Sequence, residues 1–160
     1  MKLFHKRKVK NQILKNIVKS TDIEKQIQLC FSPINSMIWC HSVADIDIHS
    51  ATSDDFEFIS RLNNNIPSFQ KNVEELLDLY DNSVKISHDF PDIQEFAIDS
   101  FKMRLNNIYR LNTSIISDVK NLYDYKTNNS LKRATSILEE MREYIQKTAH
   151  YINEIAIVEY

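Results

Sequence analysis

Apolar residues recur at alternating spacings of three and four in two stretches of the C-terminal half of the chain. The first series comprises Ile98, Phe101, Leu105, Ile108, Asn112, Ile115, Val119 and Leu122, and the second comprises Leu131, Ala134, Leu138, Met141, Ile145, Thr148, Ile152 and Ile155. Asn112 and Thr148 are the only polar members. This spacing is typical of one face of an α-helix, so the sequence predicts two long amphipathic helices between residues 91 and 160.

The two series mirror each other about a polar segment at residues 126–130. A short turn there would place the helices antiparallel, because helices joined by a few residues pack side by side. In this register Asn112 faces Met141, and Thr148 faces Leu105. Each helix has further apolar residues beside its series, so we expect additional helices to cover the hairpin.

Shorter helical patterns lie upstream. Pro67 suits the first turn of a helix. The apolar positions that follow it share one helical face and comprise Phe69, Val73, Leu76 and Tyr80. An acidic segment after Ser53 predicts another helix, since acids are favourable at a helix N-terminus. In residues 32–52 the pattern is weak, because Pro33 interrupts it and the alternation of residues 44–49 leaves helical and extended structure both open.

The first thirty residues predict a basic helix. Its apolar side comprises Val9, Ile13, Leu14, Ile17 and Val18. Thr21 and Glu24 have the spacing of a capping box, which predicts that a second helix starts at Thr21. Together the patterns predict an all-α protein: an up-down four- or five-helix bundle in a single domain of residues 1–160, with a long antiparallel helical hairpin at residues 91–160.

The charges are distributed unevenly. The net charge is −2, but residues 1–21 carry +7 and the remaining residues carry −9. The basic residues of this N-terminal arm are Lys2, Lys6, Arg7, Lys8, Lys10, Lys15 and Lys19. Three interpretations are open: the arm binds nucleic acid phosphates, adsorbs to an anionic membrane surface, or docks onto acidic residues of its own or a neighbouring chain. The third is favoured, since a run of charges most often lies on a solvated or self-pairing face.

Composition excludes some classes of site. The chain has no glycine, so it lacks the glycine-rich loops that let a nucleotide phosphate approach the backbone. No apolar run approaches the ~18 residues of a membrane span, and nothing in the sequence predicts export. Cys30 and Cys40 are therefore interpreted as reduced core residues of a cytoplasmic protein. No pattern indicates a cofactor.

Two groups of residues contain metal-ligand types. The first comprises Cys30, Cys40, His41 and His49, and the second comprises Asp45, Asp47 and His49. The first group lacks the close ligand pairs typical of structural zinc sites. The second shares one face if the segment is extended, which fits either a divalent-cation site or an exposed polar loop. We favour the loop and predict no metal site.

No motif assigns a catalytic residue. Arg142 and His150 lie on the second helix of the hairpin, but their separation is wider than the Arg–His spacing of helical nucleases of the HEPN type. The Glu-x-x-His pairs of di-iron bundles do not occur in the chain. The sequence therefore favours a protein that is not an enzyme, with a nuclease as a minor alternative.

Three residues are candidates for specific contacts with a partner. Trp39 lies in an apolar cluster, where it is either a core residue or, if exposed, part of an interface. Asn112 and Thr148 either set helix register or partner choice, or bond to a neighbouring carbonyl.

These features together favour an interaction, adaptor or accessory protein. We expect it to bind another protein, or a second copy of itself, through helical surfaces, with the basic arm as a second contact. The alternative is a nucleic-acid-associated protein that binds through residues 2–19, with or without nuclease activity. The acidic remainder of the chain weighs against this alternative, because it repels a phosphate backbone.

Overall fold

A computed structural model describes residues 2–43, 53–122 and 125–151, and these residues form six α-helices and one short 3₁₀ helix. The elements are α1 (Lys2–Leu29), α2 (Ser32–Val43), α3 (Ser53–Asn64), α4 (Ile66–Ile86), α5 (Pro91–Lys120), η2 (Tyr125–Thr127) and α6 (Asn129–Tyr151). No strand occurs in these ranges, and the predicted all-α class is confirmed.

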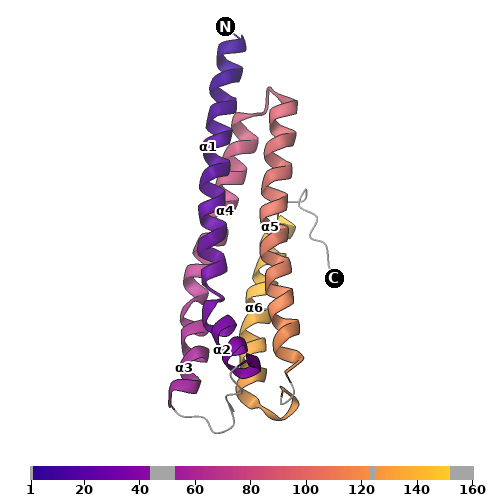
Figure 1. Ribbon diagram of the computed structural model, residues 1–160. Helices are drawn as coiled ribbons and strands as arrows, with labels where there is room; N and C mark the ends of the chain where they lie inside the picture. The colour runs from indigo at the N-terminus through magenta and orange to yellow at the C-terminus, as the bar shows by residue number, and fades with distance from the viewer. Residues whose placement is uncertain (1, 44–52, 123–124, 152–160) are drawn as a thin grey trace.

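The helices pack into an elongated bundle (Figure 1). Helices α1 and α5 run down the view in Figure 1, whereas α4 and α6 run up it, and α3 and α4 follow one another along one side. Helix α1 packs against both α4 and α5, and α5 packs against α6. The described part of α6 ends part of the way up α5, so among the described residues the upper end of the bundle is built from α1, α4 and α5.

The predicted C-terminal hairpin is confirmed and consists of α5 and α6. Its fully buried seam comprises Phe101, Leu105, Ile108, Asn112, Ile115 and Val119 from α5, and Leu131, Ala134, Leu138, Met141 and Ile145 from α6. Asn128 caps α6, since its side-chain oxygen accepts hydrogen bonds from the backbone N–H groups of Ser130 and Leu131 at 3.0 and 3.2 Å. The turn therefore ends where the mirror symmetry of the two series predicts. Ile152 and Ile155 lie outside the described residues.

The core has two parts. The larger part fills the middle and lower bundle, where the Phe101 ring lies edge-on to the Tyr80 ring with 5.9 Å between centroids. A smaller cluster of Val9, Ile13, Ile93 and Ala97 joins α1 to α5 at the upper end. Apolar burial thus holds the upper end less extensively than the hairpin.

Helix α1 is continuous over 28 residues, so the predicted restart at Thr21 is wrong. The Thr21 hydroxyl donates to the carbonyl of Ile17 at 3.1 Å, inside the helix. The Glu24 carboxylate accepts a hydrogen bond from Arg104 of α5 at 2.9 Å. Both side chains of the expected capping box are therefore engaged elsewhere.

The described residues form the predicted helical bundle, in which α3 and α4 are consecutive segments along one side. Residues 32–43, which the sequence leaves open, form α2, because Pro33 lies in the first turn, where its missing N–H costs no hydrogen bond. A break at Asn65 separates α3 from α4, and the Asn65 side-chain amide donates to the carbonyl of Cys30 at 2.9 Å. That bond ties this break to the junction between α1 and α2. Residues 44–52 lie outside the described part.

Candidate functional site

The basic arm belongs to helix α1, and most of its basic side chains face solvent. Lys6 Nζ lies 3.0 Å from Asp92 Oδ2 at the start of α5 and 6.0 Å from the centre of the Phe90 ring. The hydrogen bond from Lys6 holds the pKa of Asp92 below its ordinary value. The other six basic residues of the arm are exposed, and none forms an ion pair with a residue that the structure describes. Among the described residues, the pair between Lys6 and Asp92 is thus the only ion pair that joins the arm to the rest of the chain.

The inward side of the arm packs against the start of α5. Val9 and Ile13 are buried, and the His5 ring lies 5.6 Å from the Phe90 ring. The apolar side predicted for this helix is therefore divided, since Leu14 and Val18 remain exposed.

Polar contacts define which sides of α1 face its neighbours. The buried Asn16 amide donates to Asn82 Oδ1 at 3.1 Å and to Ser83 Oγ at 3.0 Å, both on α4. The buried Glu24 carboxylate lies 2.9 Å from the Arg104 guanidinium on α5. The side of α1 that carries Asn16 thus faces α4, and the side that carries Glu24 faces α5.

Helical geometry then locates the exposed apolar residues of α1. A helix turns by about 100° per residue, so Leu14 lies about 80° around α1 from Glu24 and about 160° from Asn16. Val18 lies one turn further along, about 40° from Leu14. Both residues are therefore on the outer side of α1, and Leu14 flanks the contact with α5.

Phe96 and Met103 occupy the matching side of α5. They lie about 80° and 100° around α5 from Arg104, so that Phe96 is opposite the buried Leu105. Since Lys6 reaches Asp92 and Glu24 reaches Arg104 on helices that run the same way, Phe96 is level with Leu14. We name Leu14, Val18, Phe96 and Met103 the α1–α5 patch.

The α5 half of this patch does not follow from the apolar spacing in the sequence. Phe96 and Met103 fall outside the series through Ile98, Phe101 and Leu105. Their separation of seven residues, two helical turns, is the only signal in the sequence that places them on a common face.

The three residues predicted for partner contacts have different surroundings. Trp39 is 60% exposed, so it does not belong to the core. Asn112 is buried, and its amide donates to the carbonyl of Leu138 on α6 at 3.1 Å, a contact between the two hairpin helices. The Thr148 hydroxyl donates to the carbonyl of Tyr144 in its own helix. Of the three, Trp39 is the most accessible to a partner, and a role for it there stays a prediction.

The candidate metal ligands are not brought together in the described residues. Cys30 is buried and its thiol donates to the carbonyl of Gln26 at 3.5 Å, and burial raises its pKa. Cys40 and His41 belong to α2, but their side chains lie outside the described part, as do residues 45, 47 and 49. Within the described ranges, no three His, Cys, Asp or Glu side chains form a group able to hold a metal.

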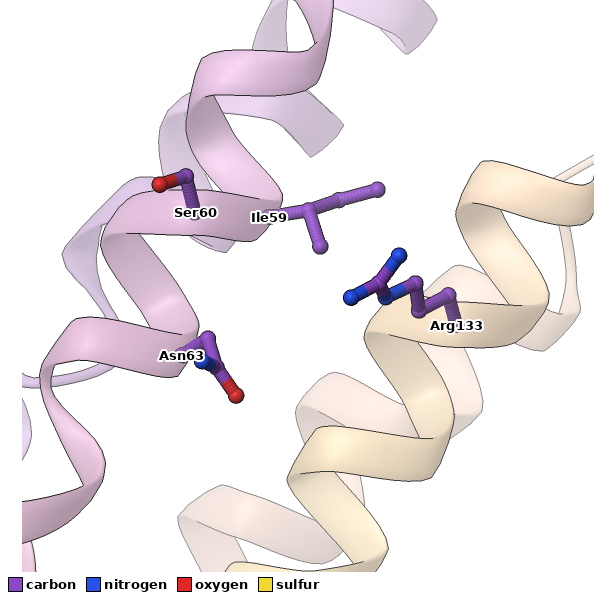
Figure 2. Close-up of a pocket in the computed structure, with 4 residues that line it drawn as sticks. All are labelled: Ile59, Ser60, Asn63 and Arg133. Atoms are coloured by element: carbon purple, nitrogen blue, oxygen red, sulfur yellow. The ribbon is translucent and has the colours of Figure 1, made fainter.

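A shallow pocket of about 210 Å³ lies between α3 and α6 and is lined by Ile59, Ser60, Asn63 and Arg133. Figure 2 shows the Arg133 guanidinium extending from α6 toward Ile59 on α3. The lining offers one cation and no acid, thiol or imidazole. Of the nuclease candidates Arg142 and His150, the His150 side chain lies outside the described residues.

Comparisons with protein-family models, with curated proteins and with solved structures find no match. Among the helices that the structure describes, none combines the length and apolar character needed to cross a membrane.

Proposed function

We propose that this protein is a non-enzymatic interaction protein that binds another protein through the α1–α5 patch. The supporting observation is that four large apolar side chains, each between 42% and 65% exposed, lie on the same side of two neighbouring helices, within two helical turns of one another along each helix. Contiguous exposed apolar surface is characteristic of protein association sites, because its transfer out of water stabilises a complex. The cysteine content keeps a cytoplasmic location as the expectation.

The surroundings of the patch suggest the chemistry of the partner. Arg7 and Lys25 each lie about 20° around α1 from Leu14, so they border the patch above and below. On α5, however, the exposed Asp92 and Asp99 lie within about 60° of both patch residues of that helix, so the rim of the patch carries both charges. Such a surface suits an amphipathic helix that has apolar residues on one face and side chains of both charges beside them.

A double variant tests this proposal. Leu14→Ser combined with Phe96→Ser removes the centre of the patch, and Leu29→Ser, an exposed apolar position near the other end of α1, is the matched control. We expect the wild type and the control to retain a partner, or a dimer, that the double variant binds at least about tenfold more weakly. Sedimentation of the purified proteins would measure the dimer, and crosslinking in the native cell would measure the complex with a partner. Circular dichroism would verify that all three proteins are equally helical. A complex that survives the double substitution would contradict the proposal.

A second candidate is binding to nucleic acid through residues 2–19. It is favoured by the six exposed basic side chains of the arm that form no ion pair with described residues. Lys8, Lys15 and Lys19 share one side of α1, so replacing all three with Gln should lower the salt dependence of binding by about one unit of slope per lysine. A gel-shift titration at two salt concentrations checks this, and no shift at low salt would rule the candidate out.

A further inference from the structure

The first turn of α1 carries two unusually exposed apolar side chains. Leu3 is 83% exposed and Phe4 is 76% exposed, the highest values among the large apolar residues that the structure describes. Figure 1 shows this end of α1 projecting past the connection between α4 and α5. His5 and Lys6 make the contacts with Phe90 and Asp92, so Leu3 and Phe4 lie above the point where the arm is held.

Basic side chains surround this projecting turn. Lys2, Arg7 and Lys8 are exposed, and none of them forms an ion pair with a described residue. The chain has no acid before Asp22. Within α1, the tip is therefore a small apolar surface surrounded by basic side chains, and the acid Asp92 lies below it, paired with Lys6.

We propose that residues 2–8 form a membrane-docking tip, in which Leu3 and Phe4 insert into the interface of a bilayer rich in anionic lipids. Lys2, Arg7 and Lys8 would then bind the lipid phosphates. Shallow apolar insertion and attraction between basic residues and anionic lipid are each weak, but they stabilise the same bound state when they occur together.

The fold selects this end-on orientation over a helix lying flat on the bilayer. A flat arrangement would require the inner apolar side of the arm, but Val9 and Ile13 are buried in the contact with α5. Insertion of the tip alone needs no rearrangement of the bundle. It also leaves the four apolar side chains of the α1–α5 patch accessible, so the membrane contact and the protein contact proposed above share only Arg7.

Nucleic acid and protein suit this tip less well. A phosphate backbone matches the basic collar, but it offers no apolar partner for Leu3 and Phe4. Two side chains on one turn also present far less area than the roughly 800 Å² that each partner buries in a stable protein complex.

The test uses the full chain and vesicles of phosphatidylcholine with or without about one quarter phosphatidylglycerol. We expect the protein to float with the anionic vesicles and not with the neutral ones. Leu3→Ser combined with Phe4→Ser keeps every charge, and it should weaken binding at least about tenfold, since two apolar side chains no longer enter the bilayer. Lys2→Gln, Arg7→Gln and Lys8→Gln should each weaken it about fivefold.

The control is Leu29→Ser, which removes an exposed apolar side chain far from the tip and should bind as the wild type does. All these positions are exposed, and circular dichroism would establish that the fold is intact. Wild-type binding by the Leu3→Ser, Phe4→Ser variant would overturn the proposal, as would equal binding to neutral vesicles or none to anionic ones. A third outcome is that the protein does not bind vesicles but binds duplex nucleic acid, with an affinity that depends on salt and is the same in the Leu3→Ser, Phe4→Ser variant. That outcome would overturn the proposal and assign the arm to nucleic acid.

Discussion

Helices α5 and α1 bury their inner faces in different ways. Ten residues of α5 are buried, and all except Tyr109 and Asn112 have pure hydrocarbon side chains. Helix α1 buries seven residues, of which Asn16, Ser20 and Glu24 are polar. The hairpin is therefore held by a wide apolar face, whereas α1 is held by a narrow one that hydrogen bonds and an ion pair complete.

This difference explains where the exposed apolar residues lie. The narrow inner face of α1 leaves Leu14, Val18 and Leu29 in solvent, as well as the tip. On α5, the exposed Phe96 lies in the upper part, above the reach of α6. We infer that the lower bundle supplies most of the stability and that the outer side of α1 and the upper part of α5 serve for contacts with other molecules.

The largest expected effect compares two phenylalanines on one helix. Phe101 is fully buried against Tyr80, so Phe101→Ala should lower the free energy of unfolding by about 4 kcal/mol through lost burial and a residual cavity. Phe96→Ala, five residues earlier on the exposed side, should change it by less than about 0.5 kcal/mol. Urea denaturation followed by helicity measures both. If both variants lowered the free energy of unfolding by similar amounts, the buried side of α5 would not differ from its exposed side in its contribution to stability.

The next effect concerns the ion pair that joins α1 to α5. Glu24→Ala should cost about 3 kcal/mol, because it leaves the largely buried Arg104 guanidinium without its partner. Replacing both residues with Met should restore most of that loss, since the double variant buries no unpaired charge. A double-mutant cycle in urea separates the two contributions. If the single and double variants were equally unstable, packing of the side chains rather than charge would hold this contact.

The hairpin was accessible from the sequence because its pattern is local and redundant. Each series holds eight positions at helical spacing, and the structure buries their central members from Phe101 to Val119 and from Leu131 to Ile145. The start of α4 was accessible for a similar reason, because Pro67 favours a first helical turn, and Pro91 occupies the same place in α5.

Which side of α1 is buried could not be predicted from the sequence in the same way. Spacing identifies Val9, Ile13, Leu14 and Val18 as one broad stripe, but only the positions of α4 and α5 decide that its first two members are buried. The capping-box prediction at Thr21 failed because Glu24 pairs with Arg104, 80 residues away. The α1–α5 patch depends on such long-range contacts, so local periodicity does not reveal it.

A smaller effect is expected at the one polar position buried in the hairpin seam. Asn112 Nδ2 bonds to Leu138, but Asn112 Oδ1 is buried without a hydrogen-bond partner among the described atoms. Asn112→Leu removes the donor and the unsatisfied acceptor together, so stability should change by no more than about 1 kcal/mol, in either direction. Urea denaturation checks the energy, and crosslinks between α5 and α6 check the register. A loss above about 2 kcal/mol would show that the single bond to Leu138 is essential to the seam.

The smallest effect is a pH dependence of stability that arises from the pair between Lys6 of α1 and Asp92 of α5. The Lys6 hydrogen bond lowers the pKa of the exposed Asp92 carboxyl in the folded state, so the pair stabilises the fold above the ordinary carboxyl pKa. That contribution is lost as the pH falls through the lowered pKa of Asp92, because the carboxyl is then protonated in both states. Asp92→Asn should therefore melt slightly below the wild type at neutral pH and together with it in strong acid, and added salt should narrow the gap. Thermal melts across this range measure the difference, and carboxyl chemical shifts of Asp92 report its titration. A difference between the two proteins that persisted unchanged into acid would mean that the charge of Asp92 does not help to hold the arm against α5.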